Sequence, residues 1–114
     1  MKIKRDPEDI KWSKLVRDRD GKCRVCGKTP PSKLDAHHIR PRGRSITRWD
    51  LSNGITLCVH HHVFGKDAIH NSINQEKWMT DIIGKKEWDR LEKLSNQYQS
   101  RDKARKEFLT KYKI

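Results

Sequence analysis

The sequence predicts a small α+β fold, in which one N-terminal helix and several C-terminal helices flank two short strands. Helix start and stop signals frame both ends of the chain, whereas the middle holds two short apolar runs bounded by turn-forming residues. The length of 114 residues makes one domain the default. We expect a single domain over residues 1–114, with a core at about 7–70 and a helical extension at about 72–112.

Strong start and stop signals predict the first helix at about residues 7–19. Asp6 can cap it, Pro7 suits its first position, and Gly21 follows its end. Its apolar stripe consists of Trp12, Leu15 and Val16.

Two short strands are predicted in the middle of the chain, at Leu34–Ile39 and at Ile55–Leu57. Asn53-Gly54 is a turn signal directly before the second strand. From Cys58 onward we expect a short helix, which Gly65 weakens.

Three further helices are predicted in the C-terminal part. A capping box at residues 72–75 opens the first, Gly84 ends it, the second runs from Lys85 to about Gln97, and the third spans about 101–111. Their inward residues are Trp78, Ile82, Trp88, Leu91, Leu94, Ala104, Phe108 and Leu109.

Composition favours a metal and a nucleic-acid partner. Apolar residues make up only 32% of the chain, so a structural metal would supply stability that a small core lacks. The formal charge of +12 favours DNA or RNA as the partner, because cationic side chains release counterions from phosphates.

The N-terminal residues lack a signal-peptide pattern, and no apolar run is long enough for a membrane span. A cytoplasmic location is therefore expected.

Two pairs of zinc-ligand residues have matching spacing. They are Cys23-x-x-Cys26 and Cys58-x-x-His61, and structural zinc sites commonly combine two such pairs. His60 and His62 adjoin the last ligand, but the spacing favours His61. We therefore predict a structural zinc ion held by these four side chains.

The other histidines indicate a second site. His37 and His38 are neighbours on a predicted strand, so their side chains point to opposite faces. One can bind a metal while the other reaches a substrate water. His62 stands at the start of a predicted helix, where it can face the strand that carries His37.

This window resembles the HNH endonuclease family, the ββα-metal or His-Me finger nucleases. The resemblance rests on His37-His38 at a strand end, Asn53 after a long loop and His62 on a helix. The segment 49–58 resembles small phage HNH proteins, and the likeness covers about residues 12–70.

The resemblance implies roles for these residues. His38 would be the general base, Asn53 would pin the loop that holds His38, and His37 and His62 would hold one divalent ion such as Mg²⁺, Mn²⁺, Ni²⁺ or Zn²⁺. Family members commonly place another ligand one helical turn after the last histidine. Lys66 stands at that position here, which leaves His70 as the candidate extra ligand.

Four arginines beside the first strand are candidate phosphate contacts, namely Arg40, Arg42, Arg44 and Arg48. We therefore predict a phage-type, metal-dependent HNH endonuclease that hydrolyses DNA phosphodiester bonds, by nicking or by double-strand cutting. One alternative is a zinc-containing DNA-binding module without catalysis. Another is a phage packaging or recombination accessory nuclease that is active only with a partner protein.

Overall fold

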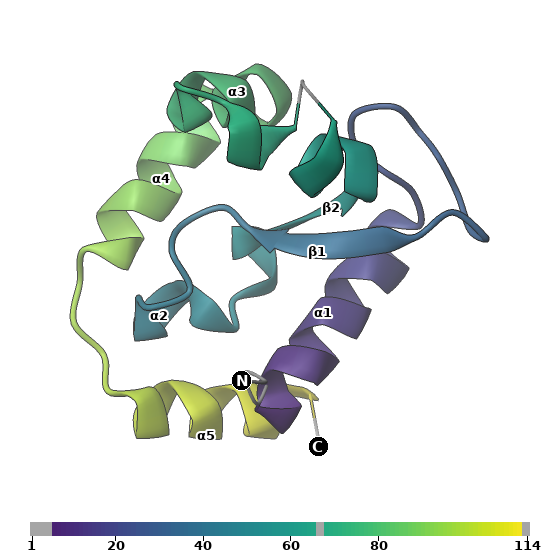
Figure 1. The fold of residues 1–114 in the computed structure, drawn as a ribbon. Coiled ribbons are helices and arrows are strands. Elements are labelled where there is room, and N and C mark those ends of the chain that lie inside the picture. The colour runs from purple at the N-terminus through teal and green to yellow at the C-terminus, as the bar shows by residue number, and fades with distance from the viewer. Residues whose placement is uncertain (1–5, 66–67, 113–114) are drawn as a thin grey trace, which may run out of the picture.

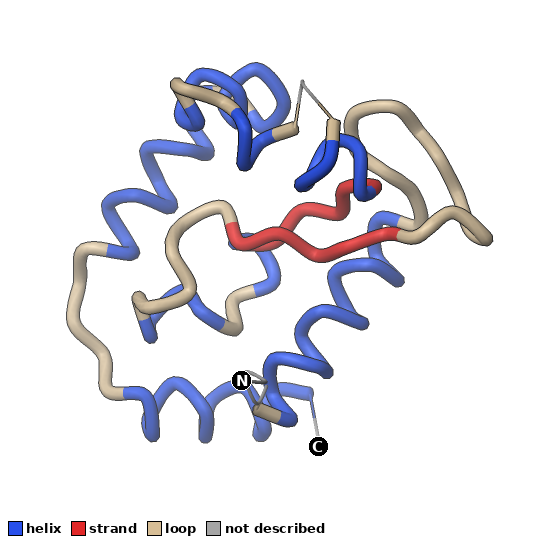
Figure 2. The backbone as a smooth tube through the Cα atoms, in the orientation of Figure 1, coloured by secondary structure: helices blue, strands red, loops and turns tan. Residues whose placement is uncertain are grey.

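The computed structural model describes residues 6–65 and 68–112 and has the predicted α+β class. Two strands lie at the centre and helices surround them (Figures 1 and 2). In chain order the elements are α1 (Pro7–Asp20), β1 (Leu34–His38), α2 (Ser45–Arg48), the 3-10 turn η1 (Leu51–Asn53), β2 (Gly54–Cys58), the π-helical turn η2 (His60–Phe64), the 3-10 turn η3 (Ile69–Asn71), α3 (Gln75–Ile83), α4 (Lys85–Ser95) and α5 (Arg101–Tyr112).

β1 and β2 form an antiparallel pair whose register places His38 opposite Gly54. Helix α1 crosses this pair closely. A Cβ atom on Gly54 would lie 2.6 Å from side-chain atoms of both Trp12 and Val16, so only glycine allows this approach. The packing of α1 therefore brings Trp12 next to the histidine end of β1.

Several predicted element ends differ from the structure. Asn74, rather than a capping box at residues 72–75, caps α3, because its Oδ1 accepts a hydrogen bond from the backbone N–H of Lys77 at 2.9 Å. Helix α4 ends at Ser95, two residues before the predicted end. The short helix α2 occupies part of the long loop expected before Asn53. The predicted helix after Cys58 is a single π-helical turn.

The core consists of two clusters, and the C-terminal helices contribute to both. The first joins the strand pair to α3 and α4, with Ile55, Leu57, Met79, Trp88 and Leu91 among its members. The second joins α1 to α5, and its buried members are Trp12, Val16, Trp49, Ala104 and Phe108. Within the described ranges, none of the helices combines the length and the apolar character that crossing a bilayer requires.

A buried ion pair connects α1 to α2 and corrects the prediction for Arg48. The Arg48 guanidinium donates to the two carboxylate oxygens of Asp9 at 3.0 and 2.7 Å, and Trp49 Nε1 donates to Asp9 at 3.0 Å. Burial would raise the pKa of Asp9, but these bonds and one from Arg42 hold it well below its usual range. Arg48 is only 5% exposed, so it is a structural residue here and is not available to bind a phosphate.

Candidate metal centres and the histidine cluster

The first cluster of metal-ligand side chains contains Cys23, Cys26, Cys58 and His61, the four residues that the spacing predicts. Sγ of Cys26 and Sγ of Cys58 lie 3.7 Å apart. His61 Nδ1 lies 3.8 Å from Cys23 Sγ and 3.2 Å from Cys58 Sγ. Tetrahedral zinc with thiolates at about 2.3 Å gives sulfur–sulfur separations of about 3.8 Å, so this donor set fits zinc.

The ionisation of Cys23 also suits metal binding. Burial would raise the pKa of its thiol, but backbone N–H groups of Cys26, Cys58 and Val25 lower it to about 6. A thiolate is the form that binds a metal. Cys23 thus favours its metal-binding form at neutral pH.

The second cluster brings together His37, His62 and His70, whose nearest ring nitrogens all lie within 4.8 Å of one another. The Nε2 atoms of His62 and His70 are 3.1 Å apart. Two imidazoles on one tetrahedral ion at about 2.0–2.1 Å have nitrogens about 3.3 Å apart. The three side chains therefore fit a shared divalent ion.

The turn at Gly65 explains how His70 reaches this cluster. The N–H of Gly65 donates to the carbonyl of His60 at 2.9 Å, and a Cβ there would lie 2.3 Å from that oxygen. The chain therefore turns sharply after η2, and η3 returns His70 to His62. The resemblance to HNH endonucleases places a metal ligand at the position of Lys66. That residue lies outside the described residues.

Asp35 is a site residue that the sequence analysis missed. Its carboxylate accepts a hydrogen bond from His62 Nδ1 at 3.1 Å. Since the carboxylate can only accept, Nδ1 carries the hydrogen, and in the neutral imidazole this leaves Nε2 with its lone pair. A carboxylate in this position orients a metal-binding histidine.

Two histidines of this cluster, His37 and His70, have lowered pKa values. Burial, together with the neighbouring His62 and His70, lowers the pKa of His37 to about 3. Burial and the neighbouring His62 also lower the pKa of His70. Neutral imidazole is the metal-binding form, so both side chains are ready to bind an ion at pH 7.

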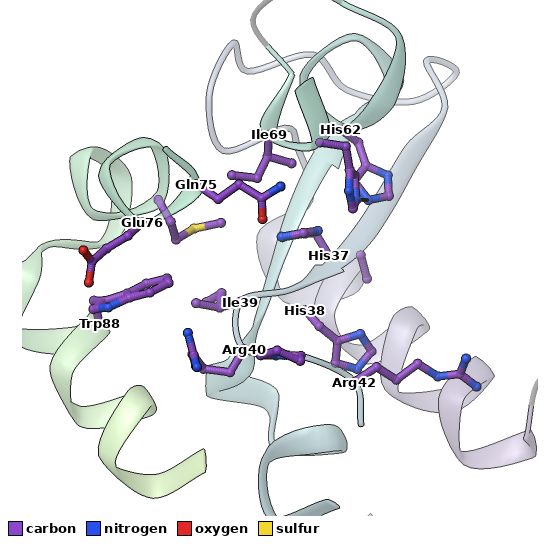
Figure 3. A pocket seen from close by; sticks show the side chains of 14 residues that line it. His37, His38, Ile39, Arg40, Arg42, His62, Ile69, Gln75, Glu76 and Trp88 are labelled. Carbon is purple, nitrogen blue, oxygen red and sulfur yellow. Dashed lines mark hydrogen bonds between the residues drawn. The ribbon is translucent and has the colours of Figure 1, made fainter. Parts of the chain in front are cut away.

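His38 lies outside the metal cluster and is held on two sides. Its Nε2 donates to the Arg48 carbonyl at 2.9 Å, which leaves Nδ1 as the unprotonated nitrogen. Its ring stacks on Trp12, with centroids 3.9 Å apart and planes 6° apart. Figure 3 shows His37 and His38 directed to different sides of β1, with His38 next to Arg42. Burial lowers the pKa of His38, so the ring is neutral and can accept a proton.

Asn53 makes the loop-pinning hydrogen bonds that sequence reasoning expected. It is fully buried; its Oδ1 accepts from the Arg40 N–H at 2.8 Å, and its Nδ2 donates to the carbonyls of Arg40 and Thr47 at 3.2 and 3.1 Å. The side chain therefore ties both ends of the segment 40–47 to the start of β2. That segment leads to Arg48, whose carbonyl holds His38.

A cavity of about 610 Å³ opens over this site. His37, His38 and His62 line it, together with Arg40 and Arg42 (Figure 3). His70 also lines it. The Arg40 guanidinium lies over the Trp88 ring and donates to Ser95, and Arg42 donates to Asp9 at 2.8 Å. Arg44 is exposed on the same loop but does not line this cavity.

Residues 23–70 match a family model described as HNH endonuclease. Over this segment the chain is similar to HNH endonucleases. Both metal-ligand clusters, together with Asp35, His38 and Asn53, lie inside the matched segment. Neither a curated protein nor a solved structure matches the chain significantly.

Proposed function

We propose that this protein is a metal-dependent endonuclease that hydrolyses phosphodiester bonds in DNA. One observation carries the proposal: three imidazoles that fit a single divalent ion lie beside a fourth imidazole whose Nδ1 is free to accept a proton. The similarity of residues 23–70 to HNH endonucleases and the charge of +12 support it.

In this mechanism His38 is the general base. Its Nδ1 accepts a proton from the attacking water, while the Arg48 carbonyl and the Trp12 ring keep the imidazole in place. His37, His62 and His70 would hold the ion, with Asp35 orienting His62. That ion would supply positive charge to the scissile phosphate and the leaving 3′ oxygen.

The remaining site residues position these groups or bind the substrate. Asn53 fixes the loop that ends at the Arg48 carbonyl. Arg40 and Arg42, at the cavity wall, would bind phosphate oxygens, and exposed Arg44 would contact the backbone farther along. We further propose that Cys23, Cys26, Cys58 and His61 hold a structural zinc ion. Phage origin and a packaging or recombination partner stay predictions from the sequence.

The ligand chemistry predicts which ions are effective. Imidazole nitrogens suit Zn²⁺, Ni²⁺ and related transition metals, whereas Mg²⁺ prefers oxygen ligands. We therefore expect Ni²⁺ to support cleavage at lower concentrations than Mg²⁺.

Cleavage of a supercoiled plasmid by the zinc-loaded protein, with each divalent ion added in turn, tests this function. His62→Ala should reduce cleavage strongly at a fixed ion concentration. His60→Ala is a matched control, because His60 is exposed and belongs to neither cluster, so this variant should cut at the parent rate. The proposal is wrong if no ion supports cleavage, or if His62→Ala cuts as fast as His60→Ala.

A further inference from the structure

A second hollow, of about 1300 Å³, joins the cavity over the histidines. Its walls come from α1, from the segment that leads into β1, and from η2. Ala36, Arg42 and His62 line both hollows. His62, one of the three clustered histidines, therefore lies where the two hollows meet, and His37 and His70 lie on the side of the first hollow.

The second hollow carries two cationic side chains that form no ion pair within the described part of the chain. Arg17 from α1 and Lys33 from the segment before β1 both line it. Arg17 donates through Nε to the Ser13 carbonyl at 3.2 Å, which fixes the side chain along α1 and leaves its terminal nitrogens available. Among the described residues, neither cation has an ion-pair partner.

The acidic groups in the same hollow are already engaged. Asp35 pairs with His62 at 3.1 Å, and Asp18 pairs with Lys14 at 2.7 Å. The charge left over in the hollow is therefore positive. Its occupant should be an anion.

The size and position of the hollow indicate a polymeric anion. Pockets for small molecules usually have volumes of about 300–1,000 Å³, and this one is larger and continues into a second hollow across the histidine cluster. A ligand that follows both hollows carries negative charge along its length and passes the histidines at one point. A nucleic-acid backbone has that chemistry.

We infer that the second hollow binds the DNA backbone on one side of the cut, with Arg17 and Lys33 contacting phosphates beyond the scissile one. Arg40 and Arg42 then contact the backbone in the first hollow. The inference rests on the proposed function, because the scissile phosphate is taken to lie at the three-histidine cluster. It adds two phosphate contacts that lie outside the basic loop at residues 40–48.

Salt-dependent DNA binding tests this inference without cleavage. A short fluorescein-labelled DNA duplex is titrated by fluorescence anisotropy, with one molar equivalent of zinc to fill the cysteine site and no other divalent ion. Each lost phosphate contact should reduce the slope of log K against log salt by about 0.9. We expect that reduction for Arg17→Gln and for Lys33→Gln, and about 1.8 for the double variant.

Two controls separate a DNA contact from a structural effect. Arg17→Lys keeps the charge and should keep the parent slope. Lys106→Gln removes an exposed charge from α5, which lines neither hollow, and should also keep the slope. Melting temperatures of all variants should match the parent, since both cations lie at the surface of the hollow.

The outcomes distinguish this inference from the proposed function. If the double variant keeps the parent slope while the parent protein cuts plasmid, the backbone path is wrong and the nuclease function stands. If the slopes fall as expected but no ion supports cleavage, the path stands and the nuclease function is wrong.

Discussion

Asn53→Ala should destabilise the protein by about 3 kcal/mol. The side chain is fully buried and makes three hydrogen bonds to backbone groups of Arg40 and Thr47. A typical hydrogen bond contributes about 1 kcal/mol net, and in this variant the backbone partners stay buried without a replacement. For a domain of this size the melting temperature should fall by roughly 12–24 °C, at about 4–8 °C per kcal/mol.

Chemical denaturation of the zinc-saturated protein, followed by circular dichroism, measures this loss. Asn71→Ala is a matched control, because Asn71 Nδ2 also donates to two backbone carbonyls, those of Val63 and Gly65, but at the exposed surface. Water can replace those bonds, so the control should lose less than about 1 kcal/mol. Equal losses in the two variants would refute the claim that burial makes Asn53 the anchor of the loop at residues 40–47.

Three further predictions concern the metal sites and the buried ion pair. Cys26→Ala should unfold the domain, because zinc binding contributes about 10–16 kcal/mol to such folds; circular dichroism and zinc content would show it, and a folded variant that keeps zinc would contradict it. Asp35→Asn should weaken metal binding at the His62 cluster by about 10- to 100-fold in isothermal titration, with unchanged zinc content. Arg48→Met should destabilise the protein by about 3–5 kcal/mol in denaturant unfolding, because it leaves the buried Asp9 carboxylate without its main partner. A loss below about 1 kcal/mol would contradict this role.

The parts of the site that local spacing determines could be predicted from the sequence. Cys23-x-x-Cys26 and Cys58-x-x-His61 are such pairs, because two ligands on one turn reach the same ion wherever that turn lies. The placement of His37 and His38 on opposite faces follows in the same way from the alternation of a strand.

Features that depend on distant contacts could not be predicted. Arg48 looks like its neighbours in a basic loop, and only the packing of α1 brings Asp9 to it. The sequence indicates His70 as a candidate ligand but not its position: His70 lies eight residues beyond His62, and the turn at Gly65 closes that distance.

Asp35 did have a local signal. It stands two residues before His37 on the predicted strand, so both side chains share a face of β1. A carboxylate on the metal-binding face is a natural partner for a metal-ligating histidine. The sequence therefore contained the information that Asp35 belongs to the site, although not which histidine it contacts.

The separation of His38 from the metal ligands is the central claim, and the cleavage rate of His38→Ala tests it most directly. Plasmid cleavage is measured at a saturating concentration of the most effective ion, with metal affinity determined on the same preparation by isothermal titration. We predict that the rate falls by about 10²- to 10⁴-fold, the usual contribution of a general base, while metal affinity stays at the parent value. A variant that cuts at the parent rate, or one that loses the metal together with activity, would contradict the assignment of His38 as the base beside a three-histidine metal site.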